Sequence, residues 1–248
     1  MAKLRINGDS SGYVDLEAPN AASSSTIDLD QIAQTNQNNT FTGGDGVVQT
    51  ISTTGNQASL KLNSPSTNND WTITNEGNVD RLRFMVTDEV GTRFPMYMHT
   101  AGYVTTPNQP SFLAGMSALQ SLVHANVTKV QFNQSVEQTG SNFSTSNYRF
   151  TCPVAGRYLF NWHVYVYSVK NMESKLYKNG SSLIRIAAPE VYQDVNPHGG
   201  GGSAIIEANA NDYFEIYAVG YHSSGGGSSV YPGSGAERAS SFSGMLIG

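Results

Sequence analysis

Hydrophobic and polar positions alternate most regularly between Tyr158 and Tyr167. Alternate residues of a strand point to opposite faces, so one face would carry Tyr158, Phe160, Trp162, Val164 and Val166, and the other Leu159, Asn161, His163, Tyr165 and Tyr167. Aromatic and β-branched residues at this period favour a pleated, largely buried surface. Pro153 and Gly156 supply the corner before the segment, because proline fixes φ and glycine tolerates positive φ. The pattern predicts the central strand of a β-sandwich.

A weaker alternation precedes it, in short apolar segments separated by turn residues. These segments lie at residues 47–51, 58–62, 71–77, 82–86 and 94–98. They predict five strands of a small β stem domain, which we place at residues 33–100. A core of this size seldom supplies enough stability alone, so we expect neighbouring chains to complete it. The polar run at residues 33–43 fits either a segment shared by three intertwined chains or a simple linker.

Residues 1–32 form a separate pattern. Two alternating segments flank the turn residues 7–12 and predict a short hairpin, and an Ile-Asp-Leu segment follows at residues 27–29. The Ser-Gly-x-Val-x-Leu-x-Ala-Pro stretch at residues 11–19, together with that segment, resembles the N-terminal region of marine tailed-phage virion proteins. The resemblance implies that residues 1–32 attach the chain to a virion through Leu4, Ile6, Tyr13, Val14, Leu16, Ile27 and Leu29. The alternative is an ordinary hairpin with a flexible tail.

Two prolines, Pro107 and Pro110, mark an extended linker at residues 101–115, and a head at residues 116–248 follows. Within the head, residues 189–202 include four consecutive glycines, and residues 223–235 are also glycine-rich. Both predict mobile loops at a variable tip, where binding residues tend to lie. The candidate binding residues there are Tyr192, His198, Tyr221, His222 and Tyr231. Tyrosine offers a large contact area with a polar end, so these side chains could stack on sugars of a bacterial surface; alternatively, they pack the sides of a trimer.

Charge and composition exclude several classes. The net charge of −5 gives no electrostatic case for nucleic acid. No apolar run approaches the length of a membrane-spanning helix, so we expect no membrane insertion. The first residues lack the apolar region of a secretion signal, so we expect the chain to be made and assembled in a cytoplasm.

Catalytic and metal chemistry finds little support in the sequence. No nucleophile with its base and no opposed pair of carboxylates emerges. The single cysteine, Cys152, fits a buried apolar role. The five histidines lack close ligand spacing, although His198 and His222 together could hold a metal or a glycan. We therefore expect no catalytic residue, no cofactor and no metal.

The head carries a family resemblance. The motif Phe150-x-x-Pro-x-x-Gly-x-Tyr-x-Phe-x-Trp162 resembles the signature of the complement-type globular head, the trimeric jelly roll shared with tumour necrosis factor. Residues 176–180, 211–217 and 240–247 resemble later elements of that family in the same order. The resemblance implies an all-β chain with a C-terminal jelly-roll β-sandwich, forming a homotrimer. The candidates for core and threefold packing are Tyr158, Phe160, Trp162, Tyr165 and Tyr167, and the face that meets the axis stays unassigned.

Three functions remain open at this point. The first is a trimeric phage fibre or spike, anchored to other virion proteins by its N-terminus and binding a host-surface glycan or protein with its head. The second is a capsid decoration or cement protein at threefold positions, and the third, remote, is a surface-polysaccharide depolymerase. The expected location is the virion, assembled in the host cytoplasm.

Overall fold

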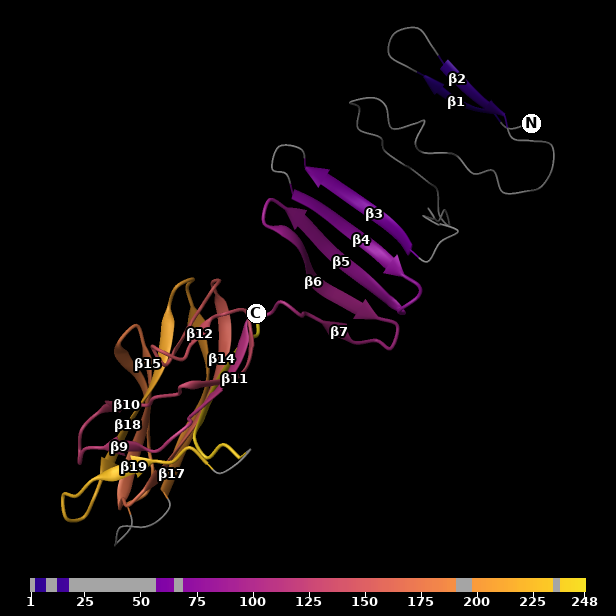
Figure 1. Ribbon diagram of the computed structural model, residues 1–248. Coiled ribbons are helices and arrows are strands. Elements are labelled where there is room, and N and C mark those ends of the chain that lie inside the picture. Colours follow the sequence, from indigo (N-terminus) through magenta and orange to yellow (C-terminus); the bar gives the residue numbers. More distant parts are fainter. Residues whose placement is uncertain (1–2, 8–12, 18–56, 65–68, 191–197, 234–236) are drawn as a thin grey trace. The chain divides into compact units, whose positions relative to one another are not determined.

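The computed structural model describes residues 3–7, 13–17, 57–64, 69–190, 198–233 and 237–248 (Figure 1). All regular secondary structure in these residues is β, which confirms the all-β prediction. The chain divides into two compact units, residues 1–50 and 51–248. The described part of the chain contains no helix that could span a membrane.

The first unit contains an antiparallel hairpin. Strand β1 (Lys3–Asn7) pairs with β2 (Tyr13–Glu17), with Leu4 opposite Leu16 and Ile6 opposite Val14. These strands fall where the alternation of residues 4–16 predicts them. Ile27 and Leu29 lie outside the described residues.

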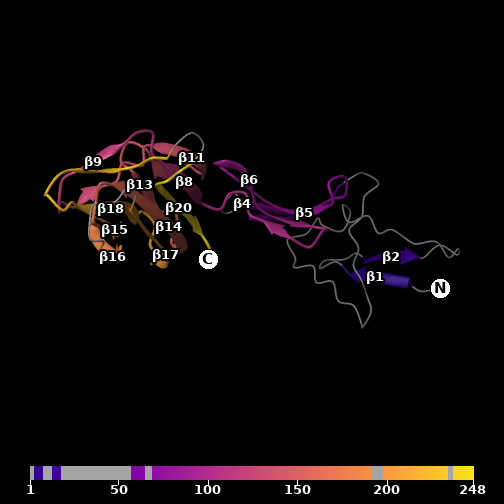
Figure 2. The same ribbon diagram turned by 90° about the horizontal axis from the view of Figure 1, so that it is seen from below.

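The second unit begins with a five-stranded antiparallel sheet, which Figure 2 shows edge-on as one curved layer. Its strands follow chain order: β3 (Gln57–Ser64), β4 (Asn69–Glu76), β5 (Arg81–Asp88), β6 (Gly91–His99) and β7 (Val104–Thr105). Four of the predicted strands are found, and the segment at residues 47–51 lies outside the described residues. Strand β7 lies within the predicted linker, where it pairs with β6.

A bulge in β6 changes one predicted orientation. Alternation would place Phe94 on the same face as Met96, but β6 carries one extra residue where Phe84 lies opposite Met96 and Val86 lies opposite Arg93. A bulge of this kind redirects a side chain. Phe94 accordingly lies on the other face, where the Arg83 guanidinium is 5.2 Å from the centre of its ring.

The remaining strands form the head, a sandwich of two antiparallel sheets whose layers lie beside each other in Figure 2. The first sheet runs β11-β8-β20-β14-β19-β9, with β17 also paired to β14. Its strands are β8 (Ser111–Gly115), β9 (Gln120–Leu122), β11 (Gln134–Thr139), β14 (Gly156–Tyr167), β17 (His198–Ala208), β19 (Ser228–Val230) and β20 (Ser241–Leu246). The second sheet runs β12-β13-β18-β15-β16, with β10 paired to β18. Its strands are β10 (Thr128–Lys129), β12 (Phe143–Ser144), β13 (Arg149–Thr151), β15 (Asn171–Lys178), β16 (Ser181–Ala187) and β18 (Tyr213–Tyr221).

Aromatic side chains fill the space between the sheets. The inward face of β14 is the one that alternation assigns to the buried side, and its five side chains are at most 4% exposed: Tyr158, Phe160, Trp162, Val164 and Val166. Phe160 lies at the centre, with its ring 4.3 Å from that of Phe214 and 5.9 Å from that of Phe242. The Trp162 indole donates to Ser174 Oγ at 3.0 Å, which satisfies its buried N–H. The predicted central strand is therefore confirmed.

Two loop predictions are corrected by this sheet. Residues 111–115, assigned above to the linker, form β8 between β11 and β20, and Phe112 is buried in the core. The four glycines at 199–202 belong to β17, which pairs with β14 from His198 to Ala208, and so do not form a mobile loop. An added Cβ at Gly202 would lie 2.7 Å from the Trp162 ring, and one at Gly199 would lie 2.8 Å from His163 Nε2. These positions lack side chains because neighbouring rings occupy both faces of the strand.

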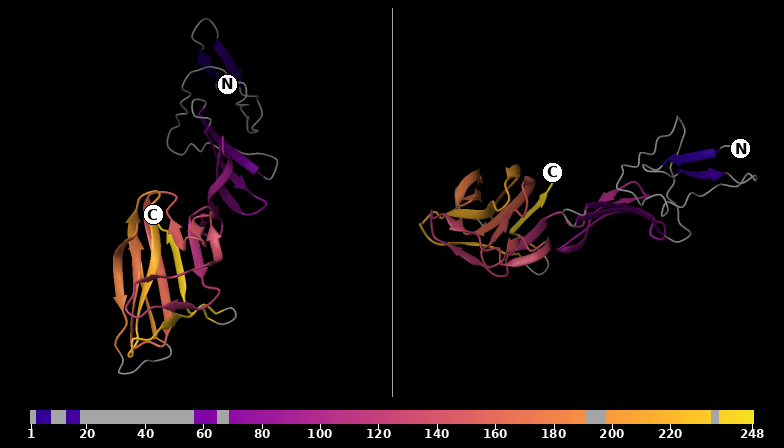
Figure 3. Two further views of the ribbon diagram at one scale, coloured as in Figure 1. Left: turned by 60° about the vertical axis from the view of Figure 1, so that its left-hand side comes forward. Right: turned by 90° about the horizontal axis from the view of Figure 1, so that it is seen from above.

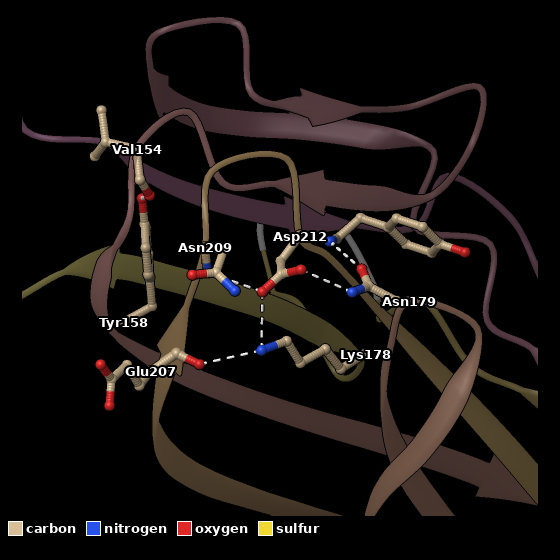
Figure 4. A network of polar contacts seen from close by, with 8 residues as sticks. Val154, Tyr158, Lys178, Asn179, Glu207, Asn209 and Asp212 are labelled. Atoms are coloured by element: carbon tan, nitrogen blue, oxygen red, sulfur yellow. Dashed lines mark hydrogen bonds and ion pairs between the residues drawn. The ribbon is translucent and has the colours of Figure 1, made fainter.

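Two turns are joined at the end of the head where β14 begins (Figure 4). Asn179 and Gly180 have φ of 53° and 78°, which suits the tight β15–β16 hairpin. Asp212, in the β17–β18 turn, accepts from Lys178 Nζ at 2.8 Å, Asn179 Nδ2 at 2.7 Å and the Asn209 N–H at 2.8 Å. Lys178 also donates to the Glu207 carbonyl at 3.1 Å. One carboxylate thus holds both turns.

This carboxylate should make the head sensitive to acid. The hydrogen bonds from Lys178, Asn179 and Asn209 lower the pKa of Asp212 to about 2, below the unfolded value of about 3.9. The stabilisation is therefore complete above about pH 4 and is lost as the pH falls towards 2. We expect Asp212→Asn to be less stable than the wild type at pH 7, and the difference to shrink between pH 4 and 2 in urea unfolding. The control, Glu190→Gln, removes an exposed pair with Lys170 and should change little; a difference for Asp212→Asn that is constant with pH would contradict this account.

Candidate functional site

The head has two distinct ends, which we call the base and the tip (Figures 1 and 3). At the base, the C-terminal strand meets the beginning of the head, where the Leu246 N–H donates to the Pro110 carbonyl at 2.9 Å. The tip contains residues 168–170, residues 222–227 and the first residue of β17, His198. The predicted binding residues can now be placed relative to these ends.

Tyr221 and His222 lie together at the tip, at the end of β18. The Tyr221 ring is edge-on to the His124 ring at 6.2 Å, and the His222 N–H donates to His124 Nδ1 at 3.1 Å. His222 Nδ1 lies 3.0 Å from Ser224 Oγ. The sequence did not identify His124 as part of this group, because it is distant from His222 in the chain and only the fold brings them together.

The hydroxyl of Tyr221 points into an ionic cluster. It donates to Glu173 Oε1 at 3.3 Å, and Lys175 and Arg185 form ion pairs with the same carboxylate. Burial favours a higher pKa for Glu173, but the hydrogen bonds from Lys175 and Arg185 outweigh it and lower the pKa. The carboxylate therefore stays charged and holds the Tyr221 hydroxyl, so mainly the edge and faces of that ring are left for a ligand.

The other predicted binding residues are not gathered with this pair. His198 donates from Nε2 to the Pro189 carbonyl at 2.9 Å, and Tyr192 lies outside the described residues. Tyr231 follows β19 and packs on the outward face of β14, with its ring 4.8 Å from Tyr167 and 6.2 Å from Tyr165. Tyr231 therefore forms a group with Tyr165 and Tyr167 on the outward face of β14.

A buried serine fixes this tyrosine group. Strand β14 changes its partner from β20 to β19 beyond His163, so the Tyr165 N–H lies between the two ladders. Ser240, fully buried, accepts from the Tyr165 N–H at 3.0 Å and donates to the Tyr231 carbonyl at 2.7 Å. His163 Nδ1 donates to the Ala239 carbonyl at 2.7 Å. The group of Tyr165, Tyr167 and Tyr231 is thus held rigidly on the sheet.

The outward face of the first sheet carries an uncharged patch. Leu159 of β14 lies between Ile205 of β17 and Met245 of β20, and the last two are 63% and 44% exposed. The next row consists of Ser203, Asn161 and Ser243. We call these six residues the neutral face. The row nearer the base is charged, with Arg157 opposite Glu207, so the neutral face has a polar edge there.

The outward face of the second sheet has the opposite character. Two carboxylates, Glu173 and Glu215, are each only 5% exposed and carry ion pairs from Lys175, Arg185 and Lys129. Charged residues are depleted at the centre of protein interfaces. Of the two outward faces, the neutral face is therefore the better suited to burial against another protein. The sequence left this choice open, although the adjacent pair Ile205-Ile206 already indicates that one of the two must point outward.

Tyr217 extends the charged face with a protonated hydroxyl. Burial and the neighbouring Glu215 carboxylate raise the pKa of Tyr217 to about 12, and its hydroxyl donates to Glu215 Oε2 at 3.3 Å. Its ring centre lies 4.0 Å from that of Tyr177. The charges on this face are thus satisfied within the chain.

The described residues include no group of three or more histidine, cysteine, aspartate or glutamate side chains that could hold a metal ion. Cys152 is fully buried, and burial raises the pKa of its thiol to about 12. A thiol in this state is inert at neutral pH.

Comparison with known proteins places the head in a family. The model of the C1q domain matches residues 111–247. Among solved structures, the globular domain of zebrafish complement 1qA protein is 19% identical over 56% of this chain and 98% of that chain, with a TM-score of 0.42. Murine APRIL at pH 5.0 is 12% identical over 56% and 99%, with a TM-score of 0.43. Eiger TNF from S. frugiperda is 14% identical over 56% and 92%, also with a TM-score of 0.43.

A curated bacterial protein is also similar. "Uncharacterized protein YqcC" of Bacillus subtilis (strain 168) is 31% identical over 111 residues, which are 42% of this chain. The chain spans 30% of the length of that relative.

The two-sheet jelly roll of the head is a C1q/TNF-like domain. The chain belongs to the C1q domain family, because the family model matches more than half of it. Domains of this kind are typically non-enzymatic binding or structural modules and generally form homotrimers. The match begins at residue 111, where β8 also begins, so the head starts earlier than residue 116, the start that the sequence predicted.

Proposed function

We propose that this chain is a homotrimeric structural protein of a tailed-phage virion, a projecting fibre or spike. Residues 1–32 attach it to other virion proteins of the tail or capsid, and the C-terminal head binds a glycan or protein of the host surface. The virion assignment rests on the likeness of residues 11–29 to phage virion proteins. The trimer rests on the family and on the neutral face, which is the observation that carries the proposal.

The neutral face is the surface that we assign to the threefold axis. Ile205 and Met245 are large apolar side chains left largely in solvent by a single head, and covering such a patch is favourable at about 25 cal/mol per Å². Tyr165 and Tyr167 lie towards the tip on the same side of β14, so they border the same interface. This assignment leaves the tip, with Tyr221 and His222, open to a ligand.

Capsid decoration is the second candidate, and the tip supplies its specific support. The Tyr221 hydroxyl, His198 Nε2 and His222 Nδ1 all have partners within the chain. A tip whose polar groups are already paired fits a head that binds nothing. In this alternative the trimer occupies threefold positions of the capsid and uses the same N-terminal attachment.

Cryo-electron microscopy of intact particles separates the two candidates. Density at the tail with the head pointing outward supports the fibre, whereas density distributed over the capsid supports decoration. Absence of the chain from the particle contradicts both. Deleting residues 1–32 should abolish incorporation, and a truncated chain that still incorporates contradicts the attachment role.

Adsorption to host cells provides the complementary test. Replacing residues 222–227 by an unrelated stretch of equal length should reduce adsorption of a fibre while leaving incorporation into particles unchanged. Unchanged adsorption would contradict a binding role for the tip.

A further inference from the structure

The five-stranded sheet exposes a continuous apolar face, separate from the neutral face of the head. Its central row places Leu60, Ile73, Phe84 and Met96 on neighbouring strands. The next row contributes Leu62 and Trp71, which are 55% and 47% exposed, and Leu60 is 44% exposed. We call these six residues the apolar stem face. Large apolar patches on a soluble protein mark interaction sites.

The opposite face of the same sheet is closed by its own polar side chains. Glu76 is 3% exposed, accepts from Arg81 Nε at 2.6 Å and forms a second ion pair with Arg83. The Arg81 guanidinium lies 4.1 Å from the centre of the Tyr97 ring. Thr74, 1% exposed, shares a hydrogen bond of 2.9 Å with Ser59. The polar groups of this face are therefore paired within the sheet. The apolar stem face is different, because its side chains can be buried only against a second layer.

The charge pattern of the apolar stem face suits self-association. Its six residues are uncharged. The row of Leu62 and Trp71 continues through Val86 to Arg93 on the same face, where Arg93 forms an ion pair with Asp88 near the β5–β6 turn, so this charge is balanced within the chain. Copies of one face can pack around an axis only if they do not repel one another. A neutral apolar face meets that condition, whereas the opposite face, with Glu76, Arg81 and Arg83, would bring like charges together.

Because the five-stranded sheet is covalently joined to the head, association of the heads brings other copies of the same sheet close to the apolar stem face. Strand β7 ends at Thr105 and β8 begins at Ser111, and the short connection between them spans at most about 20 Å. When three heads associate, each stem is held beside two copies of itself at a local concentration on the order of millimolar. A different protein would have to compete with these two copies for the apolar stem face.

We infer that three copies of the apolar stem face pack against one another and form an interchain hydrophobic core. This inference rests on the proposed homotrimer and extends it to a region outside the C1q family match. It explains how a single sheet with no second layer among its described residues is stabilised: the second layer is supplied by the partner chains.

Paired cysteine variants of the full chain test this inference. Leu60→Cys lies on the apolar stem face, and Lys61→Cys, at the next position, lies on the opposite face with a side chain that is 56% exposed. The native Cys152 is buried, so labelling of the wild-type chain gives the background rate. The measurement is the rate of maleimide labelling under native conditions, with the mass of each sample determined by light scattering. We expect labelling of Leu60→Cys to be at least about tenfold slower than that of Lys61→Cys, since it then requires the interchain core to open.

Each outcome has a distinct meaning. A trimeric mass with equal labelling rates overturns the interchain core but leaves the homotrimer intact. A monomeric mass overturns the homotrimer and the inference with it, and slow labelling of a monomer would show that another part of the same chain covers the face. Leu62→Cys, in the same strand and on the same face, replaces Leu60→Cys if that variant fails to fold.

Discussion

Replacing Phe160 with alanine should lower the free energy of unfolding of the head by about 3–5 kcal/mol, the usual cost of deleting a buried phenylalanine ring. Phe160 is fully buried. Its ring centre lies within 6.5 Å of five other aromatic rings, those of Phe112, Phe150, Tyr158, Phe214 and Phe242. Both sheets contribute to this cluster, so the cavity cannot be closed by moving one strand. Urea unfolding followed by tryptophan fluorescence measures the effect, because Trp162 lies in the same core.

The matched control is Val123→Ala, which shortens a side chain that is 67% exposed and should change stability by less than about 0.5 kcal/mol. Both variants are compared at one protein concentration, since the stability of an oligomer depends on it. A Phe160→Ala head as stable as the wild type would mean that the two sheets do not share this core.

Replacing Gly202 with alanine should destabilise the head by about 1–3 kcal/mol, the usual cost of overpacking a core. The added Cβ would lie 2.7 Å from Cζ2 and 2.8 Å from Cη2 of Trp162, whose indole is 4% exposed and hydrogen-bonded to Ser174. The ring therefore cannot move without losing that bond. Thermal unfolding with near-ultraviolet circular dichroism as the probe reports both the stability and the environment of the indole.

Gly200→Ala is the control within the same run of glycines. Its Cβ would lie 3.4 Å from Cε of Met172, a flexible side chain that tolerates small changes of shape. We expect it to be close to wild type. Equal stability of the two variants would indicate that the glycine run is not packed against β14, and would support the mobile loop that the sequence alone suggests.

The alternation of residues 158–167 predicted which side of β14 is buried, because a strand in a sandwich needs only a period of two to orient its side chains. The hairpin at Lys178–Ser181 was expected from the family resemblance of residues 176–180, and its turn is local, since Asn179-Gly180 adopts positive φ at little cost. Both features depend on residues that are adjacent in the sequence, so a short stretch of the chain is enough to predict them.

The features that sequence reasoning missed depend on residues that are distant in the chain. Four glycines in succession indicate a flexible loop when only the local sequence is considered. The reason for glycine in β17 is the ring of Trp162, on an earlier strand, which occupies the space that a side chain at Gly202 would need. Phe112 follows two prolines and was assigned to a linker, but its strand pairs with β20 near the C-terminus. Likewise His124 meets His222, and Tyr231 meets Tyr167, only through the fold. The sequence therefore proposed candidate binding residues one by one, whereas their grouping depends on the fold.

The proposed homotrimer would bury two open surfaces of the chain. The neutral face of the head and the apolar stem face are both uncharged surfaces that a single chain leaves open, and both would be buried by the same two partners. The polar faces opposite them, with the ion pairs of Glu173 and Glu76, are satisfied within one chain. This division of each sheet into a neutral and a charged side fits the proposed assembly of three chains.

The mass of the full chain in solution tests this central claim most directly. Light scattering across a dilution series should give three times the 26.6 kDa of a single chain, and the value should persist to low concentration because two separate surfaces hold the trimer. A mass of 26.6 kDa throughout the series would contradict the account, since the neutral face and the apolar stem face would then both remain in water.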